Sequence, residues 1–434
     1  MLAAVGVPSI DALFAGVPAG LLLTEAPDLG PGLDEWSLSV LMRQMADANR
    51  GARLVCFAGG GYYDRYLPAA QRALLARGEF LTAYTPYQAE VSQGTLQATF
   101  EFQTLIAELV GLPVATAGLY DGSTAVAEAV LMAHAATGRD TVLCAEGLHP
   151  ETVQVMRTYA LPRGLRLVVG PPEVAGRDDV AALVVQQPDY YGRVRDVRAL
   201  LAARPAGSLG VVAADLATLG VLEAPGALGA DIAAGEGQSV GLPLSYGGPY
   251  LGYMAASEAL LRRLPGRICG ESCDAAGRRA FVLTLQAREQ HIRRARATSN
   301  VCTNQALCAL AVTIYLSLLG PAGLRGLGAL CLRRAHYLAA ALVEVPGVAL
   351  AFPDAPFFAE FALRVPDAPG LIEGLAHRGF LVGPAVEPRT LLVAVTEKRS
   401  RAEMDGLVEA VRAVLGEAGA PAEAAPGAVG GGSR

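Results

Sequence analysis

Leu209-Gly-Val-Val-Ala-Ala-Asp215 is a short apolar run that ends on an acid, and this stretch decides the fold. A run of this length without polar alternation is typical of a strand that is buried on both faces of a parallel sheet. Similar runs occupy residues 54–58, 141–145, 165–169 and 181–186, and helical patterns lie between them at 124–136, 151–159 and 194–203. The alternation predicts an α/β fold with a mostly parallel sheet, in which ligands bind beyond the carboxyl ends of the strands.

The hydrophobic pattern and composition divide the chain into four parts. Residues 1–50 are predicted to form a helical arm, in which Asp34 starts a helix with Leu38, Leu41, Met42 and Met45 on one face. Residues 51–324 form the predicted large domain. Residues 325–417 mix helical patterns with strand-like pieces at 347–352, 358–363 and 390–395, which predicts a small α+β domain. The tail, 418–434, is rich in Ala, Gly and Pro and is expected to be disordered.

Composition narrows the class of protein. Hydrophobic residues make up 52% of the 434 residues and charged residues only 18%. The charged share is below the roughly 25% of ordinary soluble domains, so we expect extensive buried surface, including a subunit interface. The net charge of −6 and the lack of basic blocks argue against a nucleic-acid partner. Seven scattered cysteines without zinc spacing indicate free thiols in a reducing cytoplasm and no metal site, and no signal peptide is expected.

One uncharged stretch, between Arg296 and Arg325, could be mistaken for a membrane span. Gly320-Pro321 ends any helix in this stretch, so the helix expected over 303–319 would extend roughly 25 Å. That length is shorter than the ~30 Å hydrocarbon core of a bilayer. We therefore expect a buried helix and no membrane partner.

Three features have the form of a pyridoxal-phosphate (PLP) site. Asp121-Gly122-Ser123-Thr124 opens a predicted helix, where backbone amides and hydroxyls bind a phosphate; the alternative is a plain turn with an N-cap. Asp215 ends a strand, where a carboxylate pairs with the pyridinium nitrogen of PLP, although Asp is also a common turn residue. His149 follows the 141–145 strand and would stack on the ring; the alternative is a helix-start histidine without a ligand.

The lysine that such a site requires is missing. In large-sheet PLP enzymes a lysine follows the aspartate by about two to three dozen residues and forms an imine with the cofactor. Gln238 stands where that lysine is expected, and an amide nitrogen is not nucleophilic. The one lysine of the chain, Lys398, falls in the predicted small domain. We therefore predict a relic site without a covalent cofactor, made of Asp121, Gly122, Ser123, Thr124, His149, Asp215 and Gln238.

Several segments together resemble one family. The segments are 59–68 (Gly-Gly-Gly-Tyr-Tyr-Asp-Arg-Tyr-Leu-Pro), 82–94, 119–124, 231–238, 246–252 and a long run from Pro265 to Gln305. They are similar to the first subunit of the split glycine decarboxylase, the P protein of the glycine cleavage system. The resemblance implies a fold-type I PLP-transferase-like large domain and a cytoplasmic enzyme. The sequence departs from the expected family pattern at Tyr62, Arg65 and Ala89, where a small residue, a His and a Pro are expected. An arginine at position 65 cannot act as a base near neutral pH.

The resemblance also implies partners and a division of labour. PLP would be held by a homologous, lysine-bearing partner, glycine dehydrogenase subunit 2, most simply in a two-plus-two heterotetramer. The pair would decarboxylate glycine and transfer the aminomethyl group to the lipoyl group of H protein. The alternative is a non-catalytic PLP-fold scaffold that stabilises the catalytic subunit and recruits H protein. The residues expected to reach the partner's site are Tyr84, Thr85, Tyr87, Gln88, Glu90, Ser92 and Gln93, with Thr298, Ser299 and Asn300; a structural loop and simple helix capping are the alternatives for the two groups.

Overall fold

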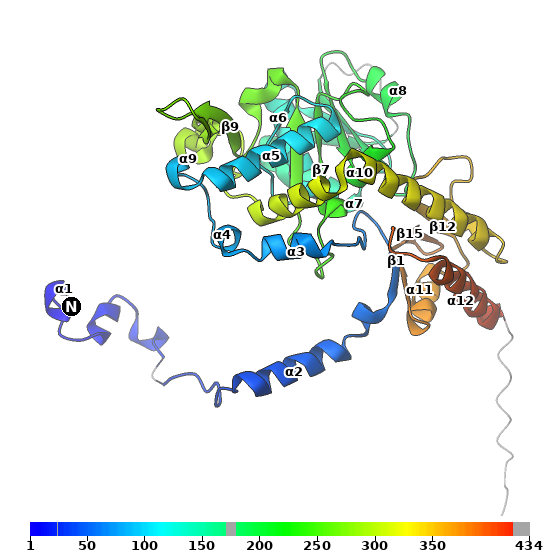
Figure 1. Cartoon of the computed structure of the whole chain (residues 1–434), viewed down its shortest axis with the longest axis horizontal. Coiled ribbons are helices and arrows are strands. Elements are labelled where there is room, and N and C mark those ends of the chain that lie inside the picture. The colour runs from blue at the N-terminus through cyan, green and yellow to red at the C-terminus, as the bar shows by residue number, and fades with distance from the viewer. Residues whose placement is uncertain (24, 171–178, 420–434) are drawn as a thin grey trace, which may run out of the picture. The chain divides into compact units, whose positions relative to one another are not determined.

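The computed structural model describes residues 1–23, 25–170 and 179–419, and the chain divides into two compact units, Met1–Arg53 and Leu54–Arg434 (Figure 1). The first unit holds α1 (Leu2–Val5), α2 (Glu35–Ala48) and three short 3-10 turns. The helix predicted to start at Asp34 is confirmed, because the Asp34 carboxylate accepts the Ser37 N–H at 2.9 Å and caps α2. Its apolar side chains Leu38, Leu41, Met42 and Met45 are exposed.

A seven-stranded sheet forms the centre of the second unit, in the order β2-β8-β7-β6-β5-β3-β4. All neighbours are parallel except β8, which pairs antiparallel with both β7 and β2. The predicted α/β class with a mostly parallel sheet is confirmed; β2, β7 and β8 were not predicted as strands. The strands are β2 (Val114–Ala115), β3 (Thr141–Cys144), β4 (Arg166–Val169), β5 (Val180–Gln187), β6 (Leu209–Ala214), β7 (Ile232–Glu236) and β8 (Gly252–Ala256).

Helices cover both faces of this sheet, as its apolar strands require. On one face, Ile232 and Ala234 of β7 pack in a core cluster with α6 (Gly122–Thr137) and α7 (Pro150–Ala160). On the other face, the intervening Ala233 packs with α5 (Gln93–Val110) and α10 (Ala306–Val343). This period of two is the signature of a strand with two buried faces.

Helix α10 contains the uncharged stretch noted in the sequence. By length and composition alone it is apolar enough to cross a membrane. In the fold, however, Val312 and Tyr315 are buried against α5 and the sheet. The helix bends at Gly320, whose φ of 60° and ψ of −179° are non-helical, followed by Pro321. The predicted helix break at this dipeptide is therefore confirmed.

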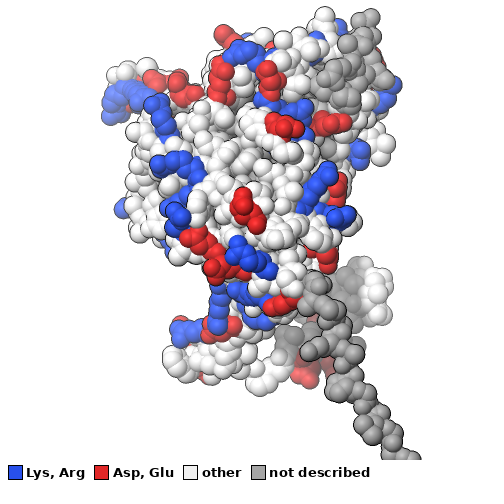
Figure 2. All heavy atoms as spheres, turned by 90° about the vertical axis from the view of Figure 1, so that its right-hand side faces the viewer, with Lys and Arg blue, Asp and Glu red and all other residues white. Residues whose placement is uncertain are grey.

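The region predicted as a small domain contains a four-stranded antiparallel sheet in the order β11-β12-β15-β14, with α11 (Ala368–His377) and α12 (Arg401–Gly419), within the same compact unit as the large sheet. Its strands are β11 (Ala349–Leu350), β12 (Glu360–Arg364), β14 (Ala385–Glu387) and β15 (Thr390–Ala394). Acidic and basic side chains are interspersed on the face shown in Figure 2. The tail predicted from residue 418 includes the last two residues of α12, and from residue 420 it lies outside the described residues.

One predicted strand pairs elsewhere than expected. The run at 54–58 forms β1 (Val55–Ala58), but it pairs in parallel with β13 (Phe380–Gly383) and not with the large sheet. Phe57 accordingly lies in the core cluster of the small domain. Its apolar pattern identifies a buried strand without encoding the partner, so the expectation that it belongs to the large sheet is wrong. A hairpin of β9 (Ile268–Cys273) and β10 (Arg279–Thr284) was not predicted.

Candidate functional site

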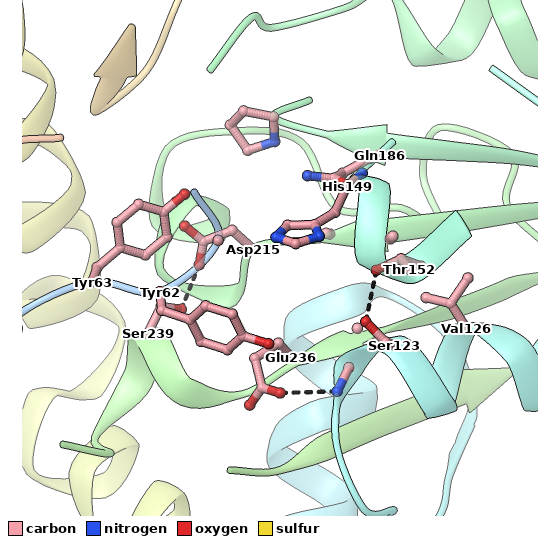
Figure 3. A pocket seen from close by; sticks show the side chains of 16 residues that line it. Tyr62, Tyr63, Ser123, Val126, His149, Thr152, Gln186, Asp215, Glu236 and Ser239 are labelled. Carbon is pink, nitrogen blue, oxygen red and sulfur yellow. Dashed lines mark hydrogen bonds between the residues drawn. The ribbon is translucent and has the colours of Figure 1, made fainter. Parts of the chain in front are cut away.

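A cavity lies at the carboxyl ends of β6 and β7, where the starts of α6 and α7 converge (Figure 3). This is the edge of the sheet at which the sequence predicted ligand binding. Its volume is about 80 Å³, well below the roughly 300 Å³ of ordinary small-molecule pockets. The lining residues are Gly61, Tyr62, Tyr63, Gly122, Ser123, Val126, His149, Thr152, Gln186, Pro188, Ala213, Ala214, Asp215, Gly235, Glu236 and Ser239.

The start of α6 is a well-made helix cap. The Asp121 carboxylate accepts the Thr124 N–H at 2.9 Å, and the Thr124 hydroxyl oxygen accepts the Asp121 N–H at 3.2 Å, which completes a capping box. These two side chains do not line the cavity, so for them the plain capping alternative holds. Gly122 and Ser123 do line it, and the hydroxyl of Ser123 lies 2.8 Å from that of Thr152.

The carboxylate of Asp215 lines the cavity but is already engaged. Its Oδ1 accepts the Ala217 N–H at 3.0 Å and a short hydrogen bond from the Ser239 hydroxyl. The Ser239 hydroxyl thus occupies one oxygen of the acid that would face a pyridinium nitrogen.

His149 lies over the cavity as the N-cap of α7. Its Nδ1 accepts the Glu151 N–H at 3.2 Å, so Nε2 carries the proton and donates to the Gly60 carbonyl at 2.9 Å. Burial lowers the pKa of His149, which favours this neutral form. The ring meets Tyr190 edge-on, with 4.8 Å between the centroids.

Tyr62 fills the space that a flat ligand would need. Its ring stacks on Tyr250 with 4.7 Å between the centroids, and it meets His149 edge-on at 6.4 Å. Figure 3 shows the ring between Asp215, His149 and Glu236. The Tyr62 ring therefore forms one wall of the cavity.

Gln238 points away from the cavity. The side chain is fully buried, its Oε1 accepts the Tyr63 N–H at 2.9 Å, and its Nε2 donates to the carbonyls of Tyr63 and Leu242, both at 2.9 Å. The amide therefore joins three backbone groups, and the next residue, Ser239, lines the cavity in its place. Gln238 belongs to the framework behind the site.

Sequence reasoning missed Glu236, the side chain at the end of β7. Its carboxylate accepts three backbone N–H groups, from Gly122 at 2.9 Å, Leu251 at 2.9 Å and Gln238 at 3.0 Å. Burial raises the pKa of Glu236 to about 7 despite these donors. The available signal was an acid at the end of an apolar strand, the same signal that selected Asp215.

These residues do not fit PLP held by this chain. The cavity is too small, its acid and its helix start are occupied by side chains of the chain itself, and no lysine lines it. Lys398, the one lysine, pairs with Asp64 at 2.6 Å. The place of the expected relic site is therefore a small cavity without a lysine.

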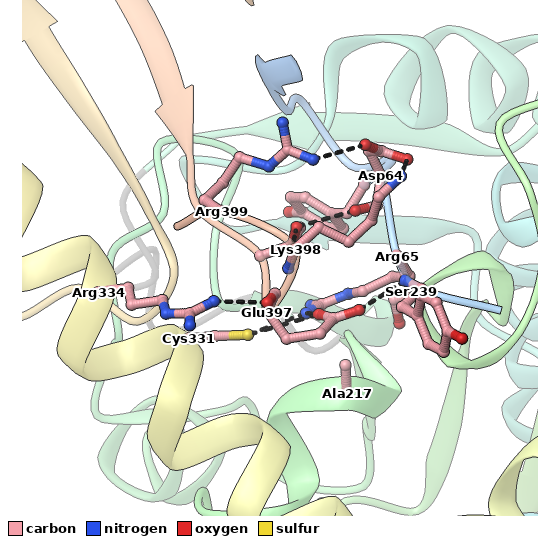
Figure 4. A network of polar contacts seen from close by, with 12 residues as sticks. Asp64, Arg65, Ala217, Ser239, Cys331, Arg334, Glu397, Lys398 and Arg399 are labelled. Carbon is pink, nitrogen blue, oxygen red and sulfur yellow. Dashed lines mark hydrogen bonds and ion pairs between the residues drawn. The ribbon is translucent and has the colours of Figure 1, made fainter. Parts of the chain in front are cut away.

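A network of polar contacts holds the 59–68 segment against residues 397–399 (Figure 4). Arg65 is buried, and its guanidinium pairs with Glu397 at 2.9 Å. Glu397 also accepts the Tyr66 N–H at 2.7 Å, while Lys398 and Arg399 pair with Asp64. The arginine found at position 65 thus makes an internal ion pair.

The same segment is held by a buried acid of the small domain. Glu360 of β12 accepts the Gly60 N–H at 2.6 Å and the Tyr63 hydroxyl at 3.0 Å. Burial raises the pKa of Glu360 to about 7. Glu360 consequently ties the 59–68 segment to β12.

Two tyrosines of the first group expected to reach a partner are held by neighbouring side chains of the chain. The Tyr84 hydroxyl is 3.4 Å from that of Thr303, and Arg267 donates to the Tyr87 hydroxyl at 2.9 Å. Tyr84 is 73% exposed and Tyr87 56%, so both rings face outward. Gln88, Glu90 and Asn300 are exposed, while Thr85, Ser92, Thr298 and Ser299 are half-buried.

Gln93 differs from the rest of its group. Its amide accepts the Phe281 N–H at 2.8 Å and donates to the carbonyls of Phe281 at 2.9 Å and Ala89 at 2.7 Å. All of these groups belong to the chain itself, and Phe281 lies on β10. Gln93 therefore anchors the β9–β10 hairpin.

No group of His, Cys, Asp and Glu suited to a metal ion occurs among residues 1–23, 25–170 and 179–419.

Comparison with known proteins supports the fold and the family. Residues 1–411 match the family described as glycine cleavage system P-protein. The chain is 48% identical over 431 residues to a probable glycine dehydrogenase (decarboxylating) subunit 1 of Prosthecochloris aestuarii, over 95% of this chain and 97% of that protein. It superposes on the crystal structure of a glycine decarboxylase (P-protein) of the glycine cleavage system in inhibitor-bound form, with a TM-score of 0.90 and 46% identity over 96% of this chain and 97% of that one.

More distant structures share the architecture alone. A glutamate decarboxylase of Lactobacillus brevis is 13% identical, with a TM-score of 0.67 over 93% of this chain and 97% of that one. The predicted fold-type I architecture is therefore confirmed. The resemblance drawn from the sequence is confirmed as well: the chain belongs to the glycine cleavage system P-protein family.

Proposed function

We propose that this chain completes the glycine-decarboxylating site of a lysine-bearing partner, glycine dehydrogenase subunit 2, in the cytoplasm. The observation that carries the proposal is the contrast between its two polar sites. The inner cavity is small and several of its polar groups bond to the chain's own side chains, whereas Tyr84 and Tyr87 are exposed on positioned loops. A partner of the same fold, in a two-plus-two assembly, would bring a lysine and PLP to these loops.

The reaction needs little from this chain beyond positioning. PLP, held by the partner, supplies the electron sink that makes loss of carbon dioxide from glycine feasible. The bond between the α-carbon and the carboxylate breaks, and the aminomethyl carbon bonds to one sulfur of the H-protein lipoyl group. The disulfide opens in that step, and its second sulfur takes up a proton.

Tyr87 is the best-positioned candidate on this chain. Its hydroxyl oxygen accepts from Arg267, so the phenolic hydrogen remains available to a carboxylate or phosphate oxygen outside the chain. The Arg267 guanidinium also lies over the Tyr87 ring, 5.3 Å from its centroid, which restrains the ring. A positioned phenol is the kind of group that orients glycine or the cofactor without entering the chemistry.

The test is exchange of labelled bicarbonate into the carboxyl group of glycine, with lipoylated H protein and reconstituted complexes. Tyr87→Phe removes one hydroxyl and keeps the ring, so assembly and cofactor content should stay unchanged. Loss of one positioning hydrogen bond costs on the order of 1–3 kcal/mol, or roughly 5- to 150-fold in rate if the bond exists only in the transition state. Wild-type exchange by both Tyr87→Phe and Tyr84→Phe would favour the alternative function, a scaffold that stabilises the catalytic subunit and recruits H protein.

A further inference from the structure

Three backbone N–H groups from separate segments converge on the carboxylate of Glu236. They come from the start of α6 (Gly122), the residue before β8 (Leu251) and the turn after β7 (Gln238). Convergent backbone amides form an anion site, and one of the three, the Gly122 N–H, lies at the start of the 16-residue α6, whose dipole favours an anion there. The structure thus contains an anion cradle that already holds an anion of the chain itself.

The cradle is also closed by close backbone packing. A Cβ atom on Gly122 would lie 2.6 Å from the Cβ and 2.7 Å from the N of Glu236. A Cβ on Gly252 would lie 2.4 Å from the carbonyl oxygen of Asp121. The end of β7 and the start of β8 therefore both lie in close contact with the start of α6, at Gly122 and Gly252.

Charge in the cavity favours the resident carboxylate over an external anion. The lining includes two acids, Asp215 and Glu236, and neither lysine nor arginine. A phosphate at the start of α6 would meet both acids without a compensating cation, which is unfavourable in a partly buried place. The Glu236 carboxylate brings one negative charge to the same three N–H donors, and it is already held in place by the fold of the chain.

We propose that the carboxylate of Glu236 takes the place of a cofactor phosphate at the start of α6, so that this subunit keeps its own cofactor site closed. Ser239 on Asp215 and Tyr62 against Tyr250 fill the rest of the site. The inference rests on the cradle and does not depend on the role proposed for Tyr87. It predicts that the cradle becomes a binding site for a small anion once the carboxylate is removed.

The experiment uses the full chain with Glu236→Ala, and with Glu236→Gln as the matched control that leaves the cradle filled. Three N–H groups lose their acceptor in Glu236→Ala, which should lower the Tm by roughly 3–6 °C. Sodium acetate, and separately inorganic phosphate, are then titrated at constant ionic strength against chloride. At least half of the lost Tm should return with one of the two anions, with saturation, because an anion bound only to the native state stabilises it.

The wild-type chain and Glu236→Gln should show no saturable response to either anion. A response of the wild-type chain equal to that of Glu236→Ala would overturn the proposal, as would an alanine variant with unchanged Tm or one that neither anion restores. If Glu236→Ala does not fold, the Tm of Glu236→Gln is compared with that of the wild-type chain at about pH 8, where the wild-type Glu236 carboxylate is mostly ionised. The glutamine amide would turn an N–H toward the cradle and should lower the Tm. A Tm equal to that of the wild-type chain would overturn the proposal.

Discussion

Gln238→Lys restores a lysine at the position where a PLP enzyme of this fold would carry one, and we expect it to damage the chain without creating a cofactor site. The substitution removes the only side-chain acceptor of the Tyr63 N–H and places an ammonium group at a fully buried position. The stranded N–H costs about 1–3 kcal/mol. The ammonium can donate to the carbonyls of Tyr63 and Leu242, but its desolvation adds a further cost of roughly 1–2 kcal/mol. The sum, about 2–5 kcal/mol, is a large part of the ~5–15 kcal/mol stability of a typical domain.

The assay combines urea unfolding of the full chain with borohydride reduction after incubation with PLP. Gln97→Lys is the matched control, because Gln97 is exposed on α5 and hydrogen-bonded to Glu101; its stability should change by less than about 0.5 kcal/mol. Peptide mapping is simple, since Lys398 is the only lysine in the background. A pyridoxyl adduct at position 238 together with glycine exchange in the absence of the partner would refute the reasoning.

The remaining predictions concern stability. Gln93→Ala should lower the free energy of unfolding by about 2–4 kcal/mol, because both backbone groups of Phe281 lose their partner; equal stability in urea would show that the hairpin needs no such anchor. Arg65→Met leaves Glu397 without its buried partner and should cost about 3–5 kcal/mol, much of which Arg65→Met/Glu397→Gln should recover in the same assay. Burial raises the pKa of Glu236 and Glu360 to about 7, above the usual 4.5 of a glutamate, so the folded state holds more protons than the unfolded state between these values. Stability should therefore fall as the pH rises from about 4.5 to 7 and level off above; an unchanged slope in Glu236→Gln/Glu360→Gln would contradict this origin.

Much of the large domain could be predicted because buried strands and their helices have distinct periodicities. The runs at 141–145, 165–169, 181–186 and 209–214 all became strands of one sheet. The strands β7 and β8 were missed because they are short and built from Ala and Gly beside only a few larger residues, which blurs the difference from a loop. The pairing of β1 with β13 joins segments more than 300 residues apart, and no local pattern specifies such a partner.

The position of the candidate site could be predicted from the sequence, but whether the site is open could not. His149 and Asp215 converge because they follow the carboxyl ends of β3 and β6 in one parallel sheet, and Gly122 starts α6 beside them. Whether such a site is open depends on single side chains. The Gln238 side chain points away from the cavity because its amide bonds to the carbonyls of Tyr63 and Leu242. Composition could not reveal that Glu236 and Tyr62 close it from inside.

The outward-facing residues were harder to separate. Tyr87 and Gln93 occur in one polar, aromatic loop, and the sequence treats them alike. The structure assigns Gln93 to the hairpin and leaves Tyr87 exposed, because the partner of an amide depends on which strand packs beside it.

The location of PLP in the active complex tests the central claim most directly. The complex of this chain with the lysine-bearing subunit would be assayed for glycine exchange, reduced with borohydride, and mapped for pyridoxyl-lysine in each subunit. Our account predicts one pyridoxyl group per pair of subunits, all of it on the partner, and no exchange by this chain alone. Stoichiometric pyridoxyl label on Lys398, with glycine turnover by this chain alone, would contradict it.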